Sequence, residues 1–214
     1  MFYRAFLALI IALSVSCQAQ AAVKVVTSTP ELAAIAKEVG GARISVVSLA
    51  KPDQDYHKVE ARPSDVRQVA QAALLVRVGM DIDLWMDAVI NAARNSKVSR
   101  GAPGYVDASA MIRKLQVPKA SITGASGDIH AMGNPHYWLD PANGKVIAYE
   151  ILLGLRKVDS KNAASYDGNY SAFVKRIDAK MQQWKASMAP VKGHPVVAYH
   201  DEWIYFYTRF GLRA

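Results

Sequence analysis

Residues 23–31 read VKVVTSTPE, and this short stretch sets the pattern on which the chain is built. Its first half shows an alternating pattern of residue types and is rich in β-branched residues, and both features are typical of a strand. The proline and the glutamate at its end are typical of the first turn of a helix. The chain therefore opens its folded part with a strand that passes directly into a helix.

The same unit recurs until about residue 94. Because strands alternate with helices, we expect parallel strands joined by helical crossovers, and hence an α/β fold. Ligands bind at the carboxyl ends of the strands in open sheets of this kind. The expected strands are 23–27, 44–49 and 74–78, and the expected helices are 30–40, about 63–72 and about 84–94.

The first 21 residues have the features of a secretory signal peptide that is cleaved after Ala21. Arg4 supplies the positive start, and residues 6–15 form an apolar segment that is too short to span a bilayer comfortably. An uncleaved anchor and a lipoprotein acylated at Cys17 are the alternatives, although Ser14 is an unfavourable residue for the latter. After cleavage the chain has no cysteine, so any metal site must use nitrogen and oxygen ligands.

Composition and charge describe an ordinary folded protein with a basic surface. Hydrophobic residues make up 51% of the chain, and the formal net charge is +8. The lysines and arginines are scattered rather than gathered in runs with interleaved aromatic residues. We interpret the charge as a solubilising surface and expect no binding of nucleic acid.

The second half of the chain predicts a long helix and then the start of another unit. Apolar residues recur every three to four positions in 161–188, which is typical of a helix. Residues 196–199 read as a strand that ends at His200, with a helix after it. One strand and one helix cannot bury both faces of a sheet, so we expect an incomplete second lobe. The expected division is a signal peptide at 1–21, an N-terminal α/β lobe at 22–158, a connecting helix at 159–190 and the start of a C-terminal lobe at 191–214.

Three histidines stand in comparable positions. His136 lies between two prolines in GNPHYWLDP, residues 133–141, where the backbone is stiff at both ends. His57 follows the second expected strand, and His200 follows the last. Imidazole is the commonest nitrogen ligand of zinc, although each histidine taken alone also suits a polar loop or a satisfied core position. We hypothesise that tertiary structure gathers the three around a metal ion.

Four segments of the chain carry a resemblance to a known family: 55–57 (DYH), 63–65 (PSD), 134–141 (NPHYWLDP) and 198–201 (AYHD). In these segments the chain resembles the substrate-binding receptors of bacterial zinc and manganese ABC transporters. The resemblance implies a two-lobed metal-receptor fold, with parallel sheets flanked by helices, a long connecting helix and a metal ion between the lobes.

The resemblance carries His57, His136 and His200 over as metal ligands. It also implies a fourth ligand, a carboxylate or a water, which the second lobe would supply beyond Ala214. Three imidazoles suit zinc better than a hard, oxygen-preferring ion, so we expect Zn²⁺. Manganese is the alternative, because members of the family that favour it tend to have Glu where this chain has His200.

Three further residues are candidates for supporting roles. His130 is a possible auxiliary metal ligand, or else a solvated loop residue. Glu60 and Glu202 are second-shell candidates that could orient a neighbouring imidazole, or else solvated carboxylates at helix starts.

The function that the resemblance implies is a high-affinity periplasmic zinc receptor. It would act without catalysis, as a monomer, and deliver zinc to the membrane permease of an ABC transporter for import. A secreted zinc hydrolase is a second hypothesis, since three histidines and a water also form catalytic zinc sites. It would need a general base near the metal, and the sequence contains no His-Glu-x-x-His helix. An adhesin with the same fold is a third hypothesis.

Overall fold

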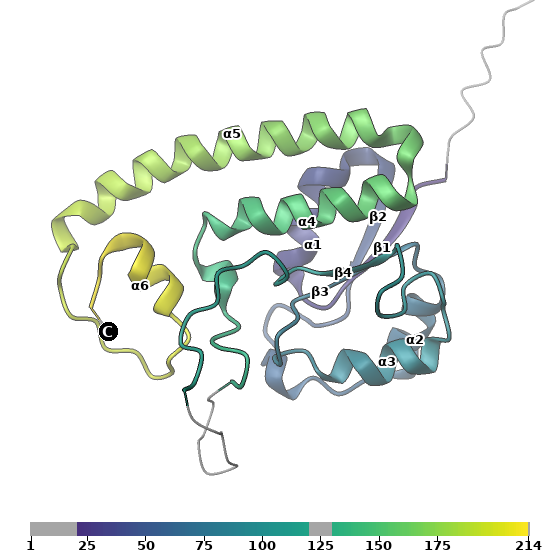
Figure 1. Cartoon of the computed structure of the whole chain (residues 1–214), viewed down its shortest axis with the longest axis horizontal. Coiled ribbons are helices and arrows are strands. Elements are labelled where there is room, and N and C mark those ends of the chain that lie inside the picture. The colour runs from purple at the N-terminus through teal and green to yellow at the C-terminus, as the bar shows by residue number, and fades with distance from the viewer. Residues whose placement is uncertain (1–20, 120–129, 214) are drawn as a thin grey trace, which may run out of the picture.

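The computed structural model describes residues 21–119 and 130–213, which form a parallel sheet between two layers of helices (Figure 1). The expected signal peptide lies outside the described residues, apart from Ala21. The strands are β1 (Val23–Thr27), β2 (Ile44–Ser48), β3 (Leu74–Arg77) and β4 (Tyr105–Asp107). The α-helices are α1 (Pro30–Gly40), α2 (Pro63–Ala70), α3 (Trp85–Ala93), α4 (Asn143–Val158), α5 (Ala163–Met188) and α6 (Ile204–Phe210). Short 3₁₀ turns are η1 (Gly41–Arg43), η2 (Tyr56–Lys58), η4 (Tyr137–Leu139), η5 (Ser160–Asn162) and η6 (Ala189–Val191).

The four strands are parallel and lie in the order β2-β1-β3-β4. In the register, Val25 of β1 stands opposite Val46 of β2 and Leu74 of β3. The chain first adds β2 on one side of β1 and then β3 on the other. This reversal of direction is the point at which ligands bind in doubly wound sheets, outside the carboxyl ends of the strands. The expected α/β fold class and the three expected strands are confirmed.

Successive side chains of each strand enter different cores, because a strand alternates its side chains between two faces. Val25 belongs to the core beneath α1 and α4, whereas Val26 belongs to the core above α2 and α3. The neighbouring residues Leu74 and Leu75 divide in the same way. Figure 1 shows α4 and α5 on one side of the sheet and α2 and α3 on the other.

Helix α4 lies unusually close to the sheet at Gly154. A Cβ atom at this position would come within 2.6 Å of a Val106 methyl group and 2.8 Å of a Leu74 methyl group. Distances this short are repulsive, so only glycine permits the observed packing. Because α4 follows directly on residues 133–141, its seat on the sheet also fixes where that loop lies.

The long helix α5 packs against α1 and α4 along its first part only. Tyr166 is buried and donates a hydrogen bond of 2.6 Å to Asp159, and Asn169 donates one of 3.0 Å to the carbonyl of Val39 in α1. After Met181 the side chains of α5 are exposed, up to residue 187. No helix in the described ranges has both the length and the apolar character needed to cross a bilayer.

The expected strand at 196–199 is wrong. This segment is irregular, and the side chains of Val197 and Tyr199 are 98% and 96% exposed. A strand is stable only when its backbone groups pair with a neighbour. The one bridge recorded near it among the described residues joins Pro195 to Arg213. Helix α6 also begins later than expected, at Ile204.

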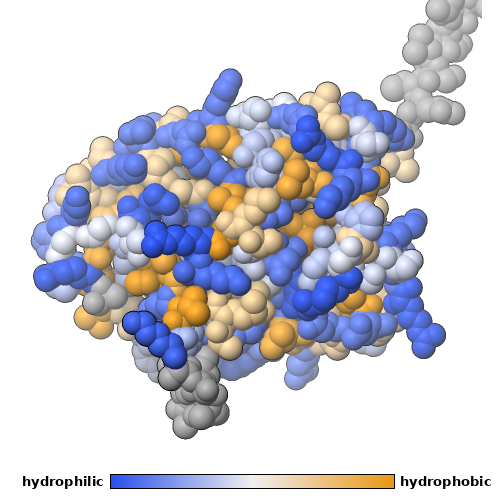
Figure 2. Space-filling view, viewed as in Figure 1, coloured by the Kyte–Doolittle hydropathy of each residue, from blue (hydrophilic) through white to orange (hydrophobic). Residues whose placement is uncertain are grey.

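Exposed apolar side chains are scattered rather than gathered on the face shown in Figure 2, where hydrophilic and hydrophobic residues are interspersed. The most exposed large apolar residues of the described chain, Val197 and Tyr199, both belong to the irregular segment before α6. The segment that carries His200 is therefore the least packed part of the C-terminal region.

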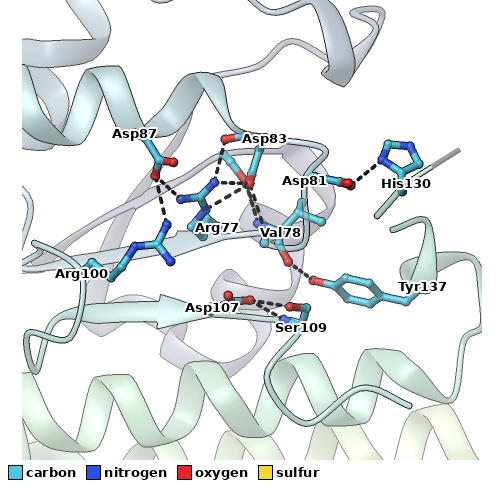
Figure 3. A network of polar contacts seen from close by, with 12 residues as sticks. Arg77, Val78, Asp81, Asp83, Asp87, Arg100, Asp107, Ser109, His130 and Tyr137 are labelled. Atoms are coloured by element: carbon cyan, nitrogen blue, oxygen red, sulfur yellow. Dashed lines mark hydrogen bonds and ion pairs between the residues drawn. The ribbon is translucent and has the colours of Figure 1, made fainter. Parts of the chain in front are cut away.

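A buried ion pair closes the end of β3 (Figure 3). Arg77 and Asp83 are 2% and 0% exposed, and the guanidinium donates to the carboxylate at 2.8 and 3.0 Å. The same carboxylate accepts the backbone N–H of Val78 at 2.7 Å and that of Gly79 at 3.2 Å. The side chain of Asp83 therefore holds the turn between β3 and α3.

We predict that Asp83→Ala lowers the free energy of unfolding by about 3–5 kcal/mol, because the mutation leaves the buried guanidinium of Arg77 without its main counter-charge. Asp87→Ala is the matched control. Asp87 contacts the same guanidinium at 2.5 Å, but its side chain is 42% exposed. Its loss should therefore cost about 1 kcal/mol or less. Urea unfolding followed by circular dichroism measures both values, and equal losses would show that burial of the pair does not decide its contribution.

Candidate metal centre

Three histidines from distant parts of the sequence meet beyond the carboxyl ends of β2 and β3. His57 lies in η2, on the connection from β2 to α2, and His130 and His136 lie on the segment that leads into α4. The ring centroids of His57 and His130 are 5.0 Å apart, and those of His57 and His136 are 5.4 Å apart. The third pair, His130 and His136, is separated by 6.1 Å. The site thus lies where the topology of the sheet places a ligand.

Each of the three imidazoles has its Nδ1 atom held by an oxygen of a different side chain. Asp55 accepts from His57 at 2.9 Å, and Asn134 lies 3.0 Å from Nδ1 of His136. Nδ1 of His130 makes a very short contact with Asp81. Such partners fix the orientation of each ring.

Asp55 and Asn134 achieve this with the same local geometry. Each accepts the backbone N–H of the histidine two residues later, at 3.0 Å, and also contacts the ring Nδ1 of that histidine. Aspartate and asparagine favour such hydrogen bonds to the backbone two residues ahead. Burial raises the pKa of Asp55, but the hydrogen bonds from His57 and Lys58 outweigh it and lower the pKa to about 2.

The three imidazoles are gathered but are not yet in a coordination geometry. In residues 21–119 and 130–213, no three His, Cys, Asp or Glu side chains are already arranged to hold a metal ion. The Nε2 atoms of His57 and His130 are 3.1 Å apart. A tetrahedral zinc ion with bonds of about 2.0–2.1 Å separates its nitrogen ligands by roughly 3.3–3.4 Å. His57 and His130 therefore have almost the spacing of two zinc ligands. Binding of the ion would require a third ligand to move toward this pair.

A cavity of about 890 Å³ contains the three histidines and also reaches His200. Trp138 forms part of its wall, with the ring centroid 5.3 Å from that of His136. Tyr56 packs against the same indole at 6.1 Å and donates a hydrogen bond of 2.8 Å to Glu31. Burial and this hydrogen bond raise the pKa of Tyr56. An aromatic wall excludes water from one side of the imidazole group.

His200 lies at the same cavity but comes from the irregular segment before α6. The ring of Tyr199 stands edge-on to its imidazole at 4.7 Å. The structure therefore brings His57, His130 and His136 into one group of rings and places His200 on the wall of the cavity that they share.

The C-terminal segment reaches the cavity because it docks on the loop that carries His136. The side-chain amide of Asn134 donates to the carbonyl of Asp201, and Tyr205 donates its hydroxyl proton to the carbonyl of Asn134 at 3.0 Å. Arg209 forms two hydrogen bonds of 2.7 Å with the carboxylate of Asp140. These contacts tie residues 201–209 to both ends of the proline-bracketed loop.

Glu60 and Glu202, the two carboxylates expected to orient a neighbouring imidazole, lie in different places. Glu60 is exposed, and Asp55 rather than Glu60 contacts Nδ1 of His57. Glu202 is half-buried at the wall of the cavity. The roles of Asp55 and Asn134 were not expected from the sequence, although each precedes a histidine by two residues, a spacing that favours a hydrogen bond to the backbone of that histidine.

We predict that Arg209→Lys loosens the docking of α6, because lysine cannot form the paired hydrogen bonds that a guanidinium makes with a carboxylate. The guanidinium is 35% exposed. After allowance for solvent screening we expect a loss of about 1 kcal/mol, and hence roughly fivefold faster amide hydrogen exchange in α6. Exchange in the first half of α5 serves as the internal control. Unchanged exchange in α6 would show that Arg209 and Asp140 do not hold the segment.

Comparisons with known proteins agree with this architecture. Residues 25–214 match the family model described as zinc-uptake complex component A, periplasmic. The chain is similar to the high-affinity zinc uptake system protein ZnuA of Brucella abortus (strain 2308), with 40% identity over 79 residues, which cover 37% of this chain and 24% of that protein. It is also similar to the manganese ABC transporter substrate-binding lipoprotein PsaA of Streptococcus pneumoniae, with 27% identity over 195 residues, covering 88% of this chain and 59% of that protein.

Among solved structures, a zinc-bound deletion mutant of ZnuA lacking 138–173 of its own sequence shares the fold, with a TM-score of 0.76 and 23% identity. The match covers 90% of this chain and 68% of that structure. The chain spans less than two thirds of the length of the two curated relatives. Since the family model covers nearly the whole chain, the protein belongs to the family of periplasmic zinc-uptake complex component A.

Proposed function

We propose that this chain is the metal-capturing part of a zinc receptor that delivers Zn²⁺ to the permease of an ABC transporter. The observation that carries the proposal is the convergence of imidazoles from separate segments on one cavity. Membership of the zinc-uptake family supports it. The role requires reversible binding and no catalysis.

The proposed ligands are His57, His136 and His200. Asp55 and Asn134 support the first two, because their oxygen atoms contact Nδ1 and thereby orient each ring. His200 lines the same cavity and would join the ion as the C-terminal segment moves toward it. Such a movement would close the site over the bound ion.

The donor set favours zinc over manganese. The oxygens of Asp55 and Asn134 are engaged with imidazole rings, so the group presents nitrogen atoms to the cavity. Imidazole suits zinc, whereas manganese prefers carboxylate, carbonyl and water oxygens. Manganese is the alternative metal, because the manganese-transporter protein PsaA is among the relatives.

The proposal extends to the rest of the chain. Residues 1–21 would direct export to the periplasm, residues 22–158 would form the first lobe, and α5 would connect it to a second lobe. The length of α5 and its attachment along the first part only support this connecting role. Residues 191–213 would belong to the second lobe.

We predict that His136→Ala weakens zinc binding by at least about 100-fold, because loss of a ligand costs more than the 10–100-fold typical of second-shell residues. Calorimetry in the presence of a competing chelator measures the affinity. His194→Ala is the control, since His194 is exposed in a turn and is not among the residues that line the cavity. Zinc affinity that survives His136→Ala would contradict the site.

We further predict that His200→Glu lowers the ratio of zinc affinity to manganese affinity by about tenfold or more. Zinc binds most nitrogen sites more tightly than manganese does, so a change of preference is more informative than the preference itself. A carboxylate at this position should weaken zinc and strengthen manganese. Competition titrations with both metals, run on the original chain and the variant, measure the ratio. A constant ratio would remove His200 from the ligand set.

A further inference from the structure

His57 and His130 turn their Nε2 atoms toward each other. Each ring contacts a carboxylate through its other nitrogen, Nδ1, with Asp55 beside His57 and Asp81 beside His130. The two Nε2 atoms are 3.1 Å apart, which is close to the spacing of roughly 3.3–3.4 Å between two nitrogen ligands of a tetrahedral zinc ion. The two rings are therefore oriented as a pair of ligands to one ion would be.

Asp81 holds His130 with two hydrogen bonds. One carboxylate oxygen contacts Nδ1 of the ring, and the other accepts the backbone N–H of Ala131 at 3.0 Å. His130 and Asp81 are 12% and 21% exposed in their side chains, so the pair is largely shielded from water. A solvated loop histidine would not need such a support. The ring is oriented in the way that carboxylates orient histidines bound to metals.

The turn that carries Asp81 is itself fixed by the interior of the protein (Figure 3). Gly79 and Met80 both have positive φ angles, of 77° and 54°. Asp83 holds the backbone of this turn through the N–H groups of Val78 and Gly79. The position of Asp81, and with it that of His130, is therefore set by the end of β3 and by the buried ion pair.

We propose that His130 supplies the fourth position of the metal site, beside His57, His136 and His200, and that Asp81 is its positioning residue. This inference rests on the proposed function, because it assumes that the cavity holds a divalent metal ion. The ion would bind to the Nε2 atoms of both His57 and His130, which already lie close to the spacing of two ligands. A tetrahedral ion takes four ligands, so four imidazoles would complete it with no carboxylate from elsewhere.

X-ray absorption spectroscopy of the zinc complex tests the assignment directly, because it counts imidazole ligands. We expect one imidazole fewer in His130→Ala than in the original chain, and a loss of zinc affinity greater than that of Asp81→Asn. His194→Ala is the control and should change neither quantity. If His130→Ala keeps both the imidazole count and the affinity, the proposal is overturned.

Asp81→Asn separates positioning from coordination. This variant should keep all imidazole ligands but bind zinc about 10-fold more weakly, the effect typical of a lost second-shell carboxylate. Asp81→Glu should recover part of the affinity, since it restores a carboxylate. Asp178→Asn, which removes an exposed carboxylate of α5 paired with Lys145, is the matched control. Thermal unfolding of the metal-free variants checks that the fold is intact, and unchanged zinc affinity in Asp81→Asn would refute the positioning role.

The zinc titrations distinguish an error in the role of His130 from an error in the proposed receptor function. If His136→Ala abolishes binding while His130→Ala does not, the receptor function stands and the role of His130 falls. If the original chain itself binds no zinc, the proposed function fails, and the assignment of His130 fails with it.

Discussion

The buried ion pair between Arg77 and Asp83 fixes the end of β3, where the sheet stops and the cavity begins. Both groups have lost their water, and such a pair is tolerated only when its remaining hydrogen bonds are satisfied. Here the carboxylate also accepts two backbone N–H groups of the turn, and the guanidinium also donates to the carbonyl of Asp83. These hydrogen bonds hold the backbone of the turn in place.

That turn supports the site from two directions. It carries Asp81, which contacts His130, and its Val78 carbonyl accepts a hydrogen bond of 2.7 Å from the hydroxyl of Tyr137. Tyr137 is completely buried and adjoins His136 in the sequence. Burial in the core raises the pKa of this tyrosine, so its hydroxyl stays protonated and keeps donating. One rigid turn thus positions two of the three gathered histidines.

The polar partners of the imidazoles are of two kinds. Asp55 and Asn134 belong to the same short segments as the histidines that they hold, so each contact with an imidazole spans only two residues. Asp81 comes from the end of a different strand, 49 residues before His130. A site built with both kinds of support combines rings that are oriented locally with a placement that depends on the whole sheet.

The sequence by itself determined the α/β class, the first three strands and the helices α1, α2, α3 and α5, because alternating and helical patterns of apolar residues depend on near neighbours. It also contained the local motifs at residues 55–57 and 134–136, since aspartate and asparagine act over two residues. Only the tertiary structure decided that His130 joins His57, from which it is 73 residues distant, and that Asp81 supports it. The same holds for residues 196–199, whose β-branched pattern favours a strand that finds only one bridge beside it, between Pro195 and Arg213, in the described structure. Strand pairing and long-range contacts depend on which segments the sheet brings together, and a linear pattern does not contain that information.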